Sequence, residues 1–302
     1  MCCLDVDKAN VGQVVATGKP YIVSISGLSM DDNMAMLDRI YDSSGISAIE
    51  LNFACPNVPD KPMVAYDFDQ MESALQRVCS HPKFRSIPLG VKLAPYFDLP
   101  HFERVASLLA RHPIKYIVSI NTIGNGLVVD GENECAGMAA RGGLGGMGGG
   151  FVKHAALANV RQFYQLFKQM NRGDIDIVGV GGVHSGMDAF ELILCGAKAV
   201  QVGTCHWTEG PECFDRIVDE LLDIMRRKGY RSIEDFRGKL KNYVKPARTN
   251  KSEEEDRLSK PSGKTTELRS VPDTVHSILL AIIAMLVFAV FYLYRELQAY
   301  QD

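Results

Sequence analysis

The sequence predicts an α/β fold and, within that class, a (β/α)8 TIM barrel. Short apolar runs rich in β-branched residues alternate with helical patterns between residues 20 and 243. Such alternation indicates a parallel sheet covered by helices. A doubly wound open sheet also fits this pattern. The barrel is favoured because nearly every apolar run ends in a polar or glycine-rich cluster, and the carboxyl ends of barrel strands build one shared active site.

Six strand–helix units are visible, whereas a closed barrel of this class has eight. Each strand is expected to be apolar on both faces, as parallel strands buried on both sides require. The expected strands are Tyr21–Ser26, Ala48–Phe53, Leu89–Leu93, Tyr116–Asn121, Ile175–Val180 and Ala199–Gly203. The expected helices are Asp32–Ser43, Phe68–Ser80, Leu99–Arg111, Ala156–Met170 and Gly186–Cys195.

Composition and charge narrow the class of protein. The chain has 302 residues, 46% of them hydrophobic and 23% charged, which is close to the globular average and excludes general disorder. The net charge of −3 offers no basic excess for phosphate backbones, so a nucleic-acid partner is not expected. Eight cysteines occur without a C-x-x-C motif. We therefore expect neither a metal site nor a redox dithiol, and reduced thiols in a cytoplasmic setting.

The C-terminal part differs from the rest. Residues 1–244 form the expected catalytic domain, and residues 245–274 are hydrophilic and typical of a flexible linker. Val275–Tyr294 is a run without a formal charge, long enough as a helix to cross a bilayer. Its apolar residues occupy every face, which favours a membrane helix over a buried core helix. We expect a tail anchor in an unidentified membrane, followed by a short tail over residues 295–302.

Two strand ends carry candidate catalytic groups. Asn52, Cys55 and Asn57 follow the second expected strand. Asparagine offers donors and acceptors to a planar polar ligand, and a loop cysteine can accept a proton as thiolate, although an isolated cysteine is more often structural. Lys92 interrupts an otherwise apolar strand. It is either a surface lysine or a fixed positive charge beside a ligand.

Two further segments admit more than one interpretation. Asn121–Gly126 follows the fourth expected strand and is either an ordinary turn or a source of amide hydrogen bonds to substrate. Arg141–Gly150 contains a G-x-G-x-x-G match. No strand immediately precedes it, so it fails as a dinucleotide-binding fingerprint, and a flexible loop is the plain alternative.

The last two strand ends predict a phosphate site. Gly181 and Gly182 lie between a strand and a helix, and Gly203 and Thr204 end the next strand. Glycines at two successive strand ends, followed by a helix N-terminus, are typical of the phosphate site that the last two loops of a barrel form. We therefore expect a ligand that bears a phosphate.

Several motifs together resemble the dihydroorotate dehydrogenase family, and more narrowly its fumarate-dependent class 1A. They are NFACPNVPDKP, GVKLAPYFD, NTIGNGLVVD, GGLGGMGGG, GVGGVHSGMDAFELILCGAKAVQVGT and KGYRSIEDFRGKLK. The resemblance runs from about Lys19 to Lys241. It implies an FMN-binding barrel that oxidises dihydroorotate to orotate in de novo pyrimidine synthesis, with fumarate as the acceptor and a homodimer as the assembly.

The resemblance also implies a role for each matching residue. Cys55 would be the catalytic base. The substrate would be held by Asn52, Asn57, Asn121 and Thr122, the last standing where serine is more usual. The flavin would be contacted by Lys92, Asn52, Asn121, Gly148, Gly149, Gly181, Gly182, Gly203 and Thr204.

Two features depart from the family pattern. The first two strand–helix units of the family have no counterpart here, so we expect an N-terminally incomplete barrel of uncertain activity. The C-terminal anchor at Val275–Tyr294 is foreign to class 1A, whose members are soluble. The alternatives are therefore another FMN-barrel pyrimidine reductase or an inactive, membrane-anchored relative.

Overall fold

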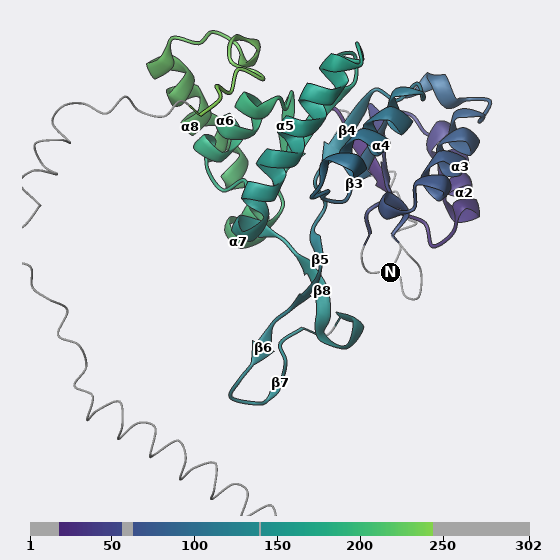
Figure 1. Cartoon of the computed structure of the whole chain (residues 1–302), viewed down its shortest axis with the longest axis horizontal. Coiled ribbons are helices and arrows are strands. Elements are labelled where there is room, and N and C mark those ends of the chain that lie inside the picture. The colour runs from purple at the N-terminus through teal and green to yellow at the C-terminus, as the bar shows by residue number, and fades with distance from the viewer. Residues whose placement is uncertain (1–17, 56–62, 139, 244–302) are drawn as a thin grey trace, which may run out of the picture. The chain divides into compact units, whose positions relative to one another are not determined.

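A computed structural model describes residues 18–55, 63–138 and 140–243 (Figure 1). Those up to Lys241 belong to one compact unit. Six strands form one sheet in the order β1-β2-β3-β4-β9-β10. Every pairing in it is parallel. The strands are β1 (Ile22–Ile25), β2 (Ala48–Asn52), β3 (Leu89–Leu93), β4 (Tyr116–Ser119), β9 (Asp176–Val180) and β10 (Ala199–Gln201).

The helices follow the strands in chain order, and successive helices pack side by side from α3 to α6 and then against α8. Their bounds are α2 (Met30–Tyr41), α3 (Phe68–Cys79), α4 (Leu99–Ala110), α5 (Lys153–Gln169), α6 (Gly186–Cys195), α7 (Thr204–Glu209) and α8 (Glu212–Lys228). Short 3₁₀ turns cover Val64–Tyr66, Phe84–Ser86, Ala140–Gly143, Gly149–Val152 and Ile233–Asp235. The alternation of parallel strands and helices is confirmed.

Local sequence signals set the helix boundaries. Ser29 caps α2 with a reciprocal capping box to Asp32, and Asp98 caps α4 by accepting from the amide of His101. Such side chains satisfy amide groups that the first helical turn leaves without partners. At the other end of the chain, α8 stops at Gly229, which adopts a left-handed conformation at φ 74° that glycine takes without steric cost.

The core lies between the sheet and the helices. Ile49, Leu51 and Leu93 are fully buried on the helix-covered face and belong to one continuous cluster with the apolar faces of the helices. Side chains alternate between the two faces of a strand, so the neighbours of these residues along each strand point to the opposite face of the sheet. The expectation of strands apolar on both faces is wrong for β1, β2, β3 and β10, because Ser24, Glu50, Lys92 and Gln201 lie on that opposite face. β4 is buried along its whole length and places the apolar Val118 there, as the register partner of Lys92.

A contact across the sheet shows that it is strongly curved. The Gln201 amide on β10 donates to the Glu50 carboxylate on β2 over 2.8 Å, although β3, β4 and β9 lie between these strands. In a flat sheet four strand spacings would separate them by about 19 Å. The two side chains meet only if the sheet closes around its polar face. This curvature is that of a barrel wall and not of a doubly wound open sheet.

An antiparallel arm follows β4 (Figure 1). It consists of β5 (Ile123–Leu127) paired with β8 (Leu144–Met147), and β6 (Val129–Asp130) paired with β7 (Cys135–Ala136). Of the two interpretations of Asn121–Gly126, the ordinary turn is wrong for residues 123–126, which belong to β5. The flexible-loop reading of Arg141–Gly150 is wrong for residues 144–147, because backbone pairing with β5 orders these residues.

The membrane helix expected at Val275–Tyr294 lies outside the described residues, as do residues 245–274 and 295–302. Among the helices over residues 18–55, 63–138 and 140–243, none has the length and apolar character needed to cross a membrane.

Candidate active site

The polar face of the sheet holds the candidate site. Asn52 and Lys92 are register partners on β2 and β3, so their side chains share a face. Glu50, two residues before Asn52, lies on the same face one level deeper and is 3% exposed. The strand register therefore brings an amide, an ammonium group and a carboxylate together at the carboxyl ends of two neighbouring strands.

Two of the predicted substrate-binding residues form a direct pair. Asn121 follows β4, and its Nδ2 atom donates to Oδ1 of Asn52 over 3.0 Å and to the Ala54 carbonyl over 2.9 Å. Its own Oδ1 accepts from the Thr122 amide. Within the described part of the chain, these bonds leave Nδ2 of Asn52 and the hydroxyl of Thr122 without a hydrogen-bond partner. Both groups remain available to a polar ligand.

Cys55 lies three residues after the end of β2 as a free, half-buried thiol. The turn that leads to it is fixed because the Ala54 amide donates to Oδ1 of Asn52 over 3.0 Å. Asn121 holds the same segment through the Ala54 carbonyl. The segment that leads to the predicted base is thus held by two of the three predicted asparagines, through the amide and the carbonyl of Ala54. Asn57 lies outside the described residues.

Lys92 is held by a polar network across the curved sheet. Its Nζ atom donates to Oε1 of Gln201 over 3.1 Å and lies 3.6 Å from Oε1 of Glu50. Ser24 donates to the same Glu50 oxygen over 2.7 Å. The lysine is therefore no mobile surface residue, because 19% of its side chain is exposed and its head group has fixed partners. A fixed positive charge beside the candidate site is the reading that the contacts support.

Glycine backbone and a threonine converge beside this network. A Cβ atom at Gly148 would lie 3.5 Å from Thr204 Oγ1 and 3.6 Å from Thr122 Cγ2, and one at Gly149 would meet Thr204 at 3.4 Å. A Cβ at Gly182 would lie 3.3 Å from the Gly149 carbonyl. The loops after β8, β9 and β10 thus approach one another closely, and each carries at least one residue that is predicted to contact the flavin.

The glycines after β9 have conformations that other residues rarely adopt. Gly181 has φ 132° and Gly182 has φ 73°. A Cβ at Gly182 would lie 2.5 Å from Cβ of Lys153, the first residue of α5. Lys153 in turn pairs with Asp188 on α6 over 2.5 Å. This ion pair fixes the start of α5 against the loop that enters α6.

Burial alone would raise the pKa of Asp188 and lower that of Lys153. For Asp188, hydrogen bonds from the Lys153 ammonium, the Ser185 hydroxyl and the His184 amide outweigh burial and lower its pKa. For Lys153, hydrogen bonds to Asp188 and Glu191 outweigh burial and raise its pKa. Both groups are charged at neutral pH, so the pair acts as an ionic clasp between two helices.

The last strand end is open where the sequence predicts a phosphate. Gly203 has φ −115° and precedes Thr204 at the start of α7. A Cβ at Gly203 would meet nothing within 4 Å among the described residues. Gly203 and Thr204 are exposed, and Gly148 and Gly149 are half-buried beside them. Exposed backbone amides at glycines, with a threonine hydroxyl, form a suitable donor set for a phosphate dianion.

These residues fit flavin mononucleotide. The glycine cradle and Thr204 supply donors for a phosphate, and Asn52 and Lys92 supply donors and positive charge for the polar edge of a flavin ring. Gln201, which bonds Lys92, lies two residues before Gly203, and Gly148 lies near both Thr122 and Thr204, so both groups of donors border the same face of the sheet. Over the described ranges, no group of three or more His, Cys, Asp or Glu side chains could hold a metal ion.

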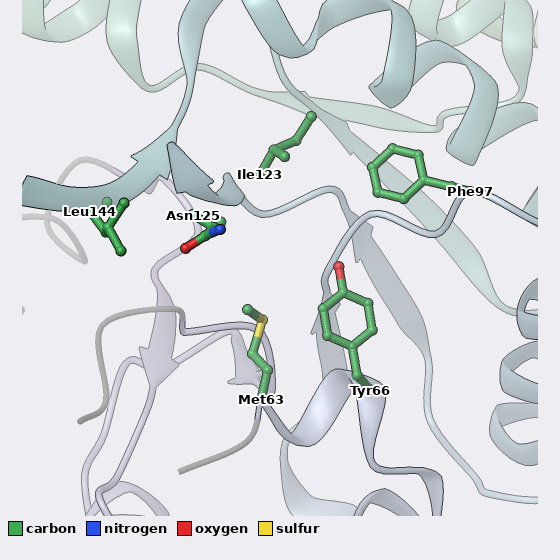
Figure 2. Close-up of a pocket in the computed structure, with 8 residues that line it drawn as sticks. Met63, Tyr66, Phe97, Ile123, Asn125 and Leu144 are labelled. Atoms are coloured by element: carbon green, nitrogen blue, oxygen red, sulfur yellow. The ribbon is translucent and has the colours of Figure 1, made fainter. Parts of the chain in front are cut away.

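A pocket lies between the segment that follows the Cys55 loop and the antiparallel arm. Figure 2 shows Met63, Tyr66 and Phe97 opposite Asn125 and Leu144. The pocket has a volume of about 280 Å³ and is mainly apolar. The Tyr66 hydroxyl donates to the Pro95 carbonyl over 2.9 Å, which ties this segment to the end of β3.

Four residues of the site were not predicted: Glu50, Gln201, Lys153 and Asp188. Glu50 and Gln201 interrupt apolar strands in the same way as Lys92, so the same signal would have found them. Lys153 and Asp188 carry no such signal: Asp188 lies in the first turn of a helix, where acidic residues are common, and Lys153 interrupts no apolar strand.

Comparison with known proteins gives the same family as the motifs. A family model described as dihydroorotate dehydrogenase matches residues 7–225. The "Dihydroorotate dehydrogenase A (fumarate)" of Lactococcus lactis subsp. lactis (strain IL1403) is 49% identical over 74% of this chain and 70% of its own length. The "Dihydroorotate dehydrogenase (fumarate)" of Saccharomyces cerevisiae (strain S288c) is 50% identical over 72% of this chain and 67% of its own length.

Among solved structures, the ligand-free dihydroorotate dehydrogenase of Eimeria tenella aligns with a TM-score of 0.60 at 20% identity, covering 78% of this chain and 70% of that one. At this identity the likeness concerns the fold alone. It agrees with the curvature of the sheet described above.

Proposed function

The chain belongs to the dihydroorotate dehydrogenase family, and on this premise we propose that it oxidises dihydroorotate to orotate with bound FMN and fumarate as the electron acceptor, in pyrimidine biosynthesis. The observation that carries the proposal is the hydrogen-bonded pair of Asn52 and Asn121 beside Lys92 and Cys55. Two amides, a cation and a thiol on one open face suit a planar substrate that must lose a proton and a hydride.

Each group has a distinct task in this proposal. Cys55 accepts the proton that leaves the substrate carbon, because a thiolate on a loop is a suitable general base. Asn52, Asn57, Asn121 and Thr122 hold the substrate so that this proton faces the thiolate. FMN, when bound, accepts the hydride. Lys92 supplies positive charge where the ring becomes more negative.

The glycine loops hold the other end of the cofactor in this proposal. Gly148, Gly149, Gly181 and Gly182 allow close backbone approach, and Gly203 and Thr204 donate to the phosphate. At Gly181 and Gly182 a side chain would not fit, because a Cβ atom there would lie too close to neighbouring atoms. The ion pair between Lys153 and Asp188 joins the starts of α5 and α6 and so holds the loops that precede these two helices next to each other.

Fumarate is the proposed oxidant for two reasons. The relatives with about half of their residues identical carry fumarate in their names, and the proposed base is cysteine, as in class 1A. Assays with fumarate and with a soluble quinone, on the same preparation, distinguish the acceptors. Reduction of quinone without reduction of fumarate would contradict this part of the proposal.

The test of the whole proposal is the flavin spectrum of the purified full-length chain, followed by orotate formation from dihydroorotate. We expect flavin absorbance at one FMN per chain. In Cys55→Ser we expect the flavin spectrum to be retained and turnover at neutral pH to fall by about 10²-fold or more, the size of a general-base contribution.

Two outcomes point to the alternatives. Flavin with reduction of other pyrimidines, and no oxidation of dihydroorotate, identifies another FMN-barrel pyrimidine reductase. A folded chain without flavin identifies a non-catalytic relative.

Two further proposals concern the whole chain. The catalytic domain over residues 1–244 lies in the cytoplasm and is anchored through Val275–Tyr294, and two chains form a homodimer. Full-length protein should then sediment with membranes, whereas a chain that ends at Lys241 should not. Light scattering of the shorter chain should give twice its monomer mass, and a monomeric mass would contradict the dimer.

A further inference from the structure

A buried carboxylate lies behind the lysine of the proposed flavin site. Glu50 is 3% exposed and carries the only negative charge that the described residues place beside Lys92. A carboxylate taken out of water needs hydrogen bonds and a compensating charge. Glu50 receives both, from Ser24, Gln201 and Lys92. None of the proposed chemical steps uses it.

Gln201 bridges the charged groups of Lys92 and Glu50. It accepts from Lys92 Nζ over 3.1 Å and donates to Glu50 Oε2 over 2.8 Å. This orientation is fixed, because an ammonium group only donates and a carboxylate only accepts. The direct distance from Lys92 Nζ to Glu50 Oε1 is 3.6 Å, longer than a hydrogen bond. Lys92 and Glu50 therefore form an ion pair without a direct hydrogen bond, and the glutamine amide bridges the two groups.

The arrangement depends on sheet curvature. Gln201 is on β10, at the far end of the strand order from β2 and β3. Only a closed polar face lets one amide reach both side chains. If Gln201 only stabilised the buried Glu50 carboxylate, which also accepts from Ser24, its contact with Lys92 would not be needed.

We propose that Glu50 and Gln201 are positioning residues that hold the Lys92 ammonium at the cofactor face and set how much of its positive charge acts on the flavin. The inference rests on the proposed function, because it assumes that FMN lies beside Lys92. The Glu50 charge offsets part of the field of Lys92. The Gln201 amide keeps Lys92 from withdrawing toward Glu50.

The two residues then have opposite effects on the reduction potential of the bound flavin. Glu50→Gln removes the offsetting charge at nearly constant shape, so the potential should rise. The ratio of affinities for reduced over oxidised FMN should increase tenfold or more, and tenfold equals about 30 mV for a two-electron couple. Gln201→Leu lets Lys92 close on Glu50 and move away from the ring, so the potential should fall.

Two matched controls isolate the effect. Ser24→Ala removes a neutral contact to Glu50, and Asp223→Asn removes the same unit of charge from an exposed pair with Arg226 on α8. Both should leave the affinity ratio within twofold. The potential is measured by equilibration with a reference dye on full-length holoprotein, together with flavin content and thermal unfolding.

The outcomes separate this inference from the proposed function. Shifts of opposite sign in Glu50→Gln and Gln201→Leu support the inference. Unchanged potentials, or shifts of the same sign, overturn it even if either variant is less stable. A folded wild-type chain without flavin overturns both proposals. If Glu50→Gln does not fold, Gln201→Leu at the half-buried position 201 decides alone: a lowered potential supports the inference, and an unchanged or raised potential overturns it.

Discussion

The side-chain amide of Asn121 donates to the side-chain oxygen of Asn52 over 3.0 Å, which joins the ends of β4 and β2 across the intervening β3. Each asparagine thereby fixes the other, and both are presented on the same open face. A single substitution should accordingly disturb two of the proposed substrate contacts.

Asn121→Ala should raise the KM for dihydroorotate. The variant loses one proposed contact and leaves Asn52 Oδ1 without one of its two donors. Loss of a partner in a partly buried network costs about 1–3 kcal/mol, which is about a 5- to 150-fold loss in kcat/KM. Steady-state kinetics provide the measurement. Asn133→Ala on the arm, where the exposed side-chain amide bonds Asp130, is the matched control and should behave like wild type.

Much of the fold could be predicted because it rests on patterns of local sequence. The bounds of β3 and α6 agree with the expected ranges, and the other predicted strands and helices begin and end within a few residues of them. Buried parallel strands are read from apolar runs. Asp98 and Ser185 mark two helix starts with capping side chains.

The arm could not be predicted in the same way. β5 and β8 carry glycine at several positions, such as Gly126 and Gly145, which are paired in register. Glycine has no side chain to alternate between faces and a low strand propensity. The Met147 side chain packs directly over Gly126, since a Cβ there would lie 2.2 Å from Cγ of Met147, so a residue with a side chain would clash with it.

The network of Lys92 shows a different limit. Glu50 and Gln201 are 151 positions apart, and nothing in local sequence relates them. Their contact follows from strand order and curvature, which are properties of the whole sheet. Lys92 was predicted because a charge in an apolar strand stands out, whereas its partners require the structure.

Gly182→Ala should destabilise the protein before any cofactor binds. The residue has φ 73°, and a Cβ would lie 2.5 Å from Cβ of Lys153 and 3.0 Å from its Cα. Left-handed backbone for a residue with a side chain costs roughly 1–2 kcal/mol, and the clash with α5 adds to it. Urea unfolding of the flavin-free protein measures the loss. Wild-type stability would show that the loop after β9 is not held against α5.

Gly203→Ala should have the opposite profile. Its φ of −115° lies outside the left-handed region, and a Cβ would meet nothing within 4 Å among the described residues, so the flavin-free protein should keep its stability within about 0.5 kcal/mol. If the phosphate approaches this backbone, a methyl group obstructs it and the Kd for FMN should rise tenfold or more. Fluorescence titration with FMN gives the Kd. Unchanged affinity would place the phosphate elsewhere.

Asp188→Asn should destabilise the protein in a pH-dependent manner. Burial favours the neutral acid, but hydrogen bonds from Lys153, Ser185 and the His184 amide lower the pKa of Asp188. A carboxyl group with a lowered folded-state pKa stabilises the protein above its unfolded pKa of about 3.9. That stabilisation is lost as the pH falls through the folded-state value. At pH 7 the variant should lose about 1–3 kcal/mol, because the half-buried Lys153 ammonium keeps only part of its pairing.

The difference between wild type and Asp188→Asn should therefore narrow as the pH falls below about 4, and urea unfolding at pH 7 and at pH 3.5 checks it. Asp31→Asn is the matched control. Asp31 pairs with Arg77 in an exposed site, where 82% of the aspartate side chain is accessible, and exposed ion pairs contribute about 0–1 kcal/mol. A loss in Asp188→Asn that is the same at both pH values would show that the position is sensitive to shape. A loss that disappears at low pH identifies the ionised carboxylate as the group that clasps α5 to α6 beside the proposed phosphate site.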